Sequence, residues 1–406
     1  METPTVSTMT MRDYSAKGNA VRLLMFGVFF TCSFRDVRFI SFLSLQDILL
    51  FTVLFPLYFG LLESSKRKKL NIYLIISFFI LLIFLCQSLM TSISPMESIF
   101  NYLKIFVAFA LLPSAIWIFV HKIEDSYLLF LGYLSGVFIS CLNSLIFKLG
   151  GSSGSRISGL SGHPVFFGIL TATAIVIALS IEYRTKQSKF LSFIPIAVFA
   201  YAMVLSASST GLVIVVSGLA VKILITLMKQ KFLSLLITMT TLLTGGILVW
   251  NANFFSYSKA RLLLSLDPQS GYSTNQISGI STFEARIFSL KYAWERIQDS
   301  PIVGHGLDTQ GRVTSIGLEP HNMLFLSWQT GGLLLLALAI FFLHISLKYF
   351  ILAIKLKFEL GIAVILVTWL GLMTEPLIYE RSILAPLFLV FITLNFESVK
   401  RRILRL

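Results

Sequence analysis

The sequence places one histidine and one arginine where they can act together on a group transfer. His321 directly precedes a long apolar run, and Arg286 lies in the first turn of a predicted helix. A neutral imidazole accepts a proton from a hydroxyl group within hydrogen-bond reach. A guanidinium group stays protonated, and its fork of donors neutralises the charge that develops on a pyrophosphate leaving group. One base with two or three arginines is therefore sufficient to move a sugar from a pyrophosphate to a hydroxyl group.

Other polar segments hold further residues suited to binding an anion or a glycan: Arg156, Arg261, His163 and Asn322. For each arginine, the alternative is a contact with lipid head groups or solvent. For His321, the alternative is a position at the membrane boundary without a chemical role. We interpret His321 as the catalytic base and the other five residues as contacts to the pyrophosphate or the glycan.

Neither a metal ion nor a cofactor is predicted. The five histidines show no pair with the close spacing of a zinc site. The chain also lacks a glycine loop of the P-loop type, which would hold nucleotide phosphates. The donor must therefore arrive already activated, as a sugar on a lipid pyrophosphate does.

The composition predicts that these residues are positioned by membrane helices. Only 13% of the residues are charged and 56% are hydrophobic, whereas soluble domains carry roughly 25% charged residues. The apolar residues fall in runs of about twenty, the length that spans a bilayer core. We expect an all-α integral membrane protein with about twelve spans, at residues 19–34, 45–62, 70–89, 99–120, 127–148, 164–182, 190–206, 210–228, 232–250, 322–343, 360–375 and 383–397.

The formal charge of +14 is distributed as an orientation signal. Basic residues cluster near residues 66–69, 184–189, 229–231, 348–357 and 400–405, in alternate loops. Positive clusters of this kind mark cytoplasmic loops. Both termini are therefore expected in the cytoplasm, the candidate residues on the opposite face, and no binding to nucleic acid.

The stretch 251–320 is a loop of roughly 70 residues, far longer than the usual connection of about 4–6. Ser281-Thr-Phe-Glu284 has the pattern of a capping box, which opens a helix. The sequence thus divides into membrane helices 1–9 at residues 1–250, a partly helical periplasmic catalytic loop at 251–320, and helices 10–12 with a basic cytoplasmic tail at 321–406.

The stretch from Glu284 to Leu307, EARIFSLKYAWERIQDSPIVGHGL, resembles the signature loop of the O-antigen ligase/polymerase superfamily. In that family, a helix that begins with arginine runs into a turn of the form sP..G.G. A His-Asn pair then opens the next span and is followed by glycines, here His321-Asn322 and Gly331-Gly332. The resemblance covers the loop and the plan of about a dozen helices.

The resemblance implies a metal-independent glycosyltransferase in the bacterial inner membrane, with its active site in the periplasm. Such an enzyme transfers polysaccharide from undecaprenyl pyrophosphate to a hydroxyl group. The acceptor of a ligase is the lipid A–core of lipopolysaccharide, and that of a polymerase is another lipid-linked repeat unit. Besides these partners, we expect only membrane lipids. We favour the ligase, with the polymerase as the alternative and a flippase for lipid-linked sugars as the alternative of another class.

The chain departs from the family pattern at three places. Leu335 stands where ligases often have a second small or polar residue, and His163-Pro164-Val165 lacks the asparagine of the usual HPN. The run 206–211, SASSTG, contains no arginine where the family often has one. Arg156 or Arg261 is then expected to supply that second charge.

Overall fold

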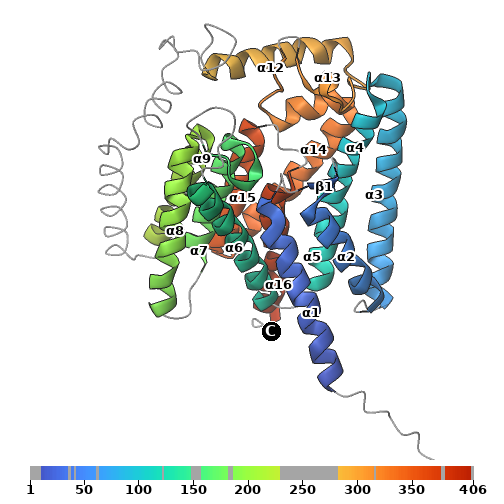
Figure 1. Cartoon of the computed structure of the whole chain (residues 1–406). Coiled ribbons are helices and arrows are strands. Elements are labelled where there is room, and N and C mark those ends of the chain that lie inside the picture. The colour runs from blue at the N-terminus through green and yellow to red at the C-terminus, as the bar shows by residue number, and fades with distance from the viewer. Residues whose placement is uncertain are drawn as a thin grey trace, which may run out of the picture.

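The computed structural model describes residues 11–34, 38–40, 43–60, 64–120, 123–147, 157–181, 186–228, 282–314, 317–375 and 380–403. These residues are almost entirely helical (Figure 1). The helices are α1 (Met11–Phe30), α2 (Leu45–Gly60), α3 (Ser64–Thr91), α4 (Pro95–Phe106), α5 (Leu112–Phe119), α6 (Ile123–Phe147), α7 (Pro164–Ser180), α8 (Lys186–Ser206), α9 (Ser209–Met228), α12 (Thr282–Asp299), α13 (Thr309–Arg312), α14 (Met323–Lys355), α15 (Glu359–Thr374) and α16 (Arg381–Ile403).

Five short elements complete the described chain: the 3₁₀ turns η1 (Thr31–Ser33) and η3 (Gly159–Ser161), the π-helix η2 (Val107–Leu111), and the antiparallel strands β1 (Arg38–Ile40) and β2 (Leu43–Ser44). The strands pair Arg38 with Ser44 and Ile40 with Leu43. This small pair is the one departure, within the described residues, from the expected all-α fold.

The apolar helices match the expectation of a membrane protein. Four of them have the length and composition to cross a bilayer: Asn71–Thr91, Pro95–Phe119, Ile123–Phe147 and Met323–Lys355. Seven further apolar helices are shorter. Every predicted span except 232–250, which lies outside the described residues, coincides with one of these eleven helices. The total of twelve spans remains a prediction.

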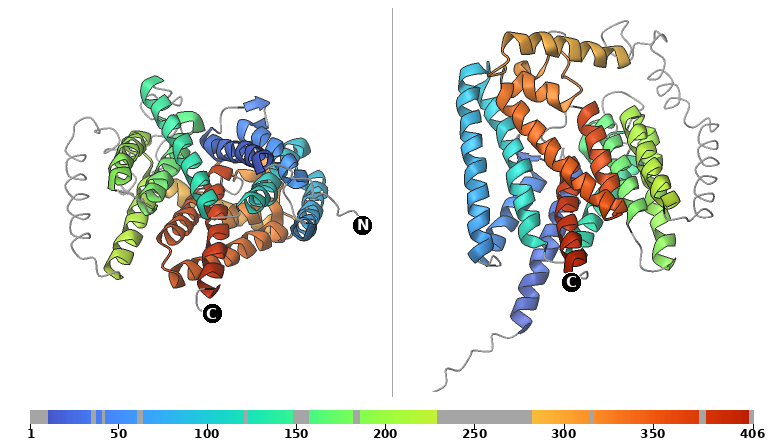
Figure 2. Two further views of the ribbon diagram at one scale, coloured as in Figure 1. Left: turned by 90° about the horizontal axis from the view of Figure 1, so that it is seen from below. Right: turned by 180° about the vertical axis from the view of Figure 1, so that it is seen from behind.

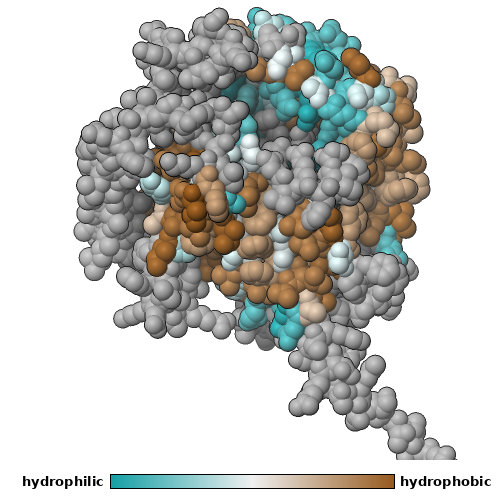
Figure 3. All heavy atoms as spheres, in the orientation of Figure 1, coloured by the Kyte–Doolittle hydropathy of each residue, from teal (hydrophilic) through white to brown (hydrophobic). Residues whose placement is uncertain are grey.

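The surface of the molecule is divided into an apolar and a polar region. On the face shown in Figure 3, the described atoms form an apolar belt across the middle of the molecule, while hydrophilic residues gather at the end where α12 and α13 lie. Such a belt is what a bilayer covers. The polar end therefore corresponds to the face on which α12 and the candidate residues stand.

The interior of the bundle is built around α7, whose side chains are nearly all buried. Helices α8, α9 and α15 pack against it, as the view from below in Figure 2 also shows. Helices α7 and α9 approach closely at two glycines, since a Cβ on Gly211 would lie 2.7 Å from the carbonyl oxygen of Gly168. Small residues permit this spacing between membrane helices, and it fixes the first turn of α9 beside α7 and α15.

Candidate active site

The first turn of α14 places His321 on a rigid element. Asn322 occupies the N-cap position, and its side-chain oxygen accepts hydrogen bonds from the backbone N–H groups of Leu324 at 2.9 Å and Phe325 at 3.3 Å. A cap of this type satisfies donors that have no partner within the helix. The side chain of Asn322, predicted as a substrate contact, thus holds the start of α14, with His321 directly before it.

A buried carboxylate connects His321 to Arg286. Glu375 follows the last residue of α15, and its side chain is 9% exposed. Its Oε2 lies 3.3 Å from Nδ1 of His321, and its Oε1 accepts a hydrogen bond of 2.7 Å from Nη2 of Arg286. The histidine contact is within ion-pair distance, although the ring orientation does not give it hydrogen-bond geometry. His321 and Arg286, which were predicted separately, therefore meet on one carboxylate.

Thr210, in the first turn of α9, completes the group. Its hydroxyl donates a hydrogen bond of 3.0 Å to Oε1 of Glu375 and accepts one of 3.2 Å from Nη2 of Arg286. We call these four residues, His321, Glu375, Arg286 and Thr210, the Glu375 cluster. They come from four separate segments of the chain, namely α9, α12, the start of α14 and the end of α15.

The surroundings keep Glu375 charged. Burial alone would raise the pKa of this carboxyl group, because it disfavours the ionised form. The nearby imidazole of His321, the charge of Arg286 and the hydrogen bond of Thr210 outweigh that effect. The net result is a pKa of Glu375 below its ordinary value.

The cluster leaves one side of both basic residues open. The side chains of His321 and Arg286 are 27% and 28% exposed. Nδ1 of His321 is buried against Glu375, so the exposed part of the ring lies away from that nitrogen. Arg286 uses Nη2 for Glu375 and Thr210. The exposed parts of both side chains are thus available to a ligand.

The turn at residues 300–306 explains the spaced glycines of the signature. The backbone N–H groups of His305 and Gly306 donate to the carbonyl oxygens of Gln329 and Thr330, both at 2.9 Å. These carbonyls accept from the turn because α14 is interrupted at Gly332, where φ is +58° and ψ is −153°. A Cβ on Gly332 would overlap the carbonyl oxygen of Ile302. The glycines therefore allow two backbone segments to touch.

The same turn is fastened to the connection between α3 and α4. Asp308 is fully buried, and its carboxylate accepts hydrogen bonds of 2.8 Å from the N–H groups of Ser94 and Gly311. The N–H of Leu307 donates to the hydroxyl of Ser98 at 2.8 Å. These contacts hold the end of α12, and with it Arg286, over the bundle (Figure 1).

The other predicted site residues are not among the described members of the cluster. His163 precedes α7, and its side chain is exposed. Arg156 and Arg261 lie outside the described residues. The second cationic contact therefore stays a prediction.

Sequence reasoning missed Glu375 and Thr210 as members of the site. Glu375 was visible as an acidic residue at the end of an apolar run, which is a signal of function in membrane proteins. Its partners could not be deduced, because Arg286 lies 89 residues and Thr210 lies 165 residues away in the chain.

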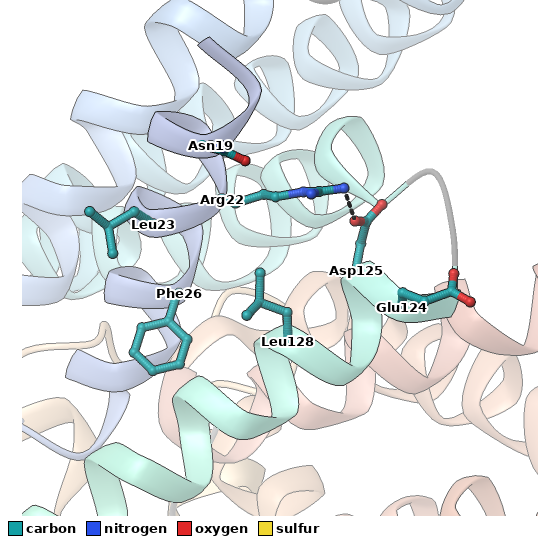
Figure 4. Close-up of a pocket in the computed structure, with 7 residues that line it drawn as sticks. All are labelled: Asn19, Arg22, Leu23, Phe26, Glu124, Asp125 and Leu128. Carbon is teal, nitrogen blue, oxygen red and sulfur yellow. Dashed lines mark hydrogen bonds and ion pairs between the residues drawn. The ribbon is translucent and has the colours of Figure 1, made fainter. Parts of the chain in front are cut away.

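Two further features of the described residues bear on what the site can bind. No three His, Cys, Asp or Glu side chains within the described ranges come together as a metal-binding group. A separate hollow lies between α1 and the start of α6, where Arg22 pairs with Asp125 at 3.5 Å (Figure 4). None of the residues lining this hollow belongs to the Glu375 cluster.

Comparison with known proteins identifies the part of the chain that carries the cluster. Residues 191–340 match the family described as O-antigen ligase, while no curated protein matches the chain. Three of the four cluster residues, Thr210, Arg286 and His321, lie within the matched region. This match over residues 191–340 confirms the resemblance to the O-antigen ligase/polymerase superfamily.

Proposed function

We propose that the chain is an O-antigen ligase, which transfers polysaccharide from undecaprenyl pyrophosphate to a sugar hydroxyl of lipid A–core on the periplasmic face of the inner membrane. One observation carries the proposal: within a region of the O-antigen ligase family, His321 and Arg286 meet on the buried carboxylate of Glu375. A base with its orienting partner and an adjacent guanidinium group are the parts that transfer from a pyrophosphate requires.

His321 is the proposed general base. The carboxylate of Glu375, 3.3 Å from Nδ1, favours the tautomer of His321 that is protonated at Nδ1, which keeps the lone pair of Nε2 for the acceptor. As the hydroxyl oxygen of the acceptor bonds to the anomeric carbon of the donor sugar, its proton passes to Nε2. The imidazolium that results is stabilised by the negative charge of Glu375 at 3.3 Å. Glu375 is therefore a positioning residue for His321.

Arg286 is the proposed contact to the leaving group. The bond that breaks joins the anomeric carbon to a pyrophosphate oxygen, which takes the electron pair and leaves as undecaprenyl pyrophosphate. Glu375 and Thr210 engage only Nη2 of Arg286, so the exposed part of its side chain remains for donation to that oxyanion. Preorganised donors of this type stabilise charge that develops in the transition state. Pyrophosphate is a good leaving group and needs no general acid.

The polymerase alternative uses the same chemistry with a second lipid-linked repeat unit as acceptor. A flippase would instead carry ionisable residues near the bilayer midplane. The Glu375 cluster lies at the ends of α9, α14 and α15, at the polar end of the bundle, which favours a reaction at the surface.

The lipopolysaccharide of a deletion strain tests the proposal. For a ligase, we expect all attached polymer to disappear while lipid-linked polymer accumulates, and the wild-type gene but not His321→Ala to restore attachment. A core capped by a single repeat unit would identify a polymerase. Unchanged lipopolysaccharide would reject both reactions.

A further inference from the structure

An apolar cavity lies directly beneath the first turn of α14. It has a volume of about 400 Å³ and is bounded by α3, α4, η2, α14 and α16. Along α14 it is lined by Met323, Leu335, Ala339 and Ile345, so that one end lies two residues from His321. Met323 lines the cavity before the break at Gly332, and beyond the break α14 covers about 15 Å between Leu335 and Ile345, at a rise of about 1.5 Å per residue. The cavity thus follows α14 on both sides of the break and through a large part of the roughly 30 Å of a hydrocarbon core.

The cavity walls offer a ligand almost nothing but hydrocarbon and aromatic surface. Two of the few polar side chains in the lining are engaged within the protein, since the hydroxyl of Ser77 donates to the carbonyl of Tyr73 and that of Tyr73 donates to the carbonyl of Phe109. The rings of Phe109, Phe342 and Phe388 pack edge to face around the interior. Because polar groups are costly to bury without a partner, the occupant must be an apolar chain.

The cavity opens sideways, toward the lipid. Ile76 on α3 and Phe341 on α14 line it and are 55% and 60% exposed on the apolar belt of the molecule. Phe109 and Ala110, which also line the cavity, belong to η2, where the helix widens into a π-turn. Such turns are frequent at functional sites. A chain can therefore enter from the bilayer without crossing the polar end of the bundle.

We propose that this cavity binds the polyisoprenoid tail of the lipid-linked donor, with the pyrophosphate at the Met323 end beside His321. The position decides between donor and acceptor. In a polyprenyl pyrophosphate glycan, only the pyrophosphate separates the hydrocarbon chain from the reacting sugar carbon. In a lipid-anchored acceptor, a core oligosaccharide separates the acyl chains from the reacting hydroxyl group. A cavity whose lining extends to Met323, two residues from the proposed base, fits the donor.

The inference rests on the proposed function, yet the two can fail separately if binding is measured without transfer. The full-length protein in phospholipid nanodiscs is irradiated with undecaprenyl pyrophosphate that carries a diazirine in its tail and no sugar. We expect crosslinks on α3, α4, α14 and α16 at the lining residues. We also expect these crosslinks to be displaced by unlabelled undecaprenyl pyrophosphate but not by phosphatidylethanolamine.

Two alanines of α14 provide a matched pair of variants. Ala339 is buried and lines the cavity, whereas Ala337 is exposed on the same helix and does not line it. Filling the cavity with Ala339→Phe should reduce crosslinking by about tenfold or more, because overpacking excludes the chain. Ala337→Phe should leave it unchanged, and Ala339→Leu should give an intermediate loss.

Several results would overturn the inference. Crosslinks outside the cavity in the wild-type protein, displacement by phosphatidylethanolamine, or equal labelling of Ala339→Phe and Ala337→Phe each contradict it, whether or not His321 is required for transfer. The wild-type crosslinking map decides the question even if Ala339→Phe does not fold.

Discussion

At the scale of single residues, the site depends on how one carboxylate is shared. Glu375 accepts from Arg286 and Thr210 through Oε1 and faces His321 through Oε2. Because one carboxylate serves both residues, the orientation of the His321 ring is linked to the position of the Arg286 guanidinium group. The family motif was enough to predict His321 and Arg286, since their spacing is visible in the sequence. It could not predict Glu375 as their common partner, because folding alone brings the end of α15 to the start of α14.

The lowered pKa of Glu375 predicts how stability depends on pH. A carboxyl group whose pKa is depressed by folding stabilises the native state above its ordinary pKa of about 4.5. That contribution is lost as the pH falls from this value through the lower pKa of the folded state. We therefore expect the melting temperature of the wild-type protein to drop more between about pH 5 and about pH 3 than that of Glu375→Gln.

The same substitution should slow glycan transfer by about tenfold to a hundredfold at neutral pH, as loss of an orienting partner usually does. Parallel pH dependence of the two melting temperatures would mean that Glu375 carries no stabilising charge. Full activity of Glu375→Gln would show that Glu375 does not position His321 for transfer.

Arg286→Lys separates the charge of Arg286 from its geometry. Lysine keeps the positive charge but cannot bond Glu375 through one nitrogen while offering another to a pyrophosphate. We expect transfer to fall by about a hundredfold, measured as the rate of polymer attachment by the purified protein. Lys291→Arg, an exposed change on the same helix, serves as control and should have no effect. Wild-type activity of Arg286→Lys would indicate a surface role for Arg286.

At the scale of elements, the important contact is between the turn at 300–306 and the break in α14. The apolar runs were sufficient to predict the helices, and the capping box at 281–284 predicted the start of α12 to within a residue. The interruption at Gly332 could not be deduced, because the need for it comes from the carbonyl of Ile302 on another segment. Close packing between the turn and α14 therefore requires the signature glycines. This packing helps to set the position of the first turn of α14 beside Glu375.

Two glycines with similar backbone angles test this. Gly332 (φ +58°) and Gly317 (φ +75°) both adopt a conformation that costs other residues about 1–3 kcal/mol. Only at Gly332 does an added Cβ also overlap backbone, because nothing lies within 4 Å at Gly317. Gly332→Ala should therefore lower the melting temperature and abolish transfer, while Gly317→Ala has a small effect on both. Equal effects of the two variants would show that the contact with Ile302 does not matter.

At the scale of the whole molecule, α12 lies across the end of a bundle whose sides are apolar (Figures 1 and 3). Composition alone predicted such a bundle, and the described helices agree with it. Their packing order, with α7 enclosed by α8, α9 and α15, could not be predicted, because nearly uniform apolar faces do not specify a neighbour. The orientation rests on the basic clusters and is still a prediction.

Single cysteines can determine that orientation in intact cells. In a variant with Cys86 replaced by alanine, Gln310→Cys should react with a membrane-impermeant maleimide from outside the inner membrane. Lys355→Cys, at the far end of α14, should react only after permeabilisation. Both positions are exposed, whereas Cys32 and Cys141 are buried. Labelling with the opposite sidedness would place the Glu375 cluster in the cytoplasm and end the proposal.

The rate at which purified His321→Ala moves polysaccharide from undecaprenyl pyrophosphate to lipid A–core tests the account most directly. We predict a loss of about a hundredfold to ten-thousandfold, the usual contribution of a general base, in a protein that keeps the melting temperature of the wild type. Transfer at the wild-type rate by this variant would contradict the central claim that His321 removes the proton from the acceptor.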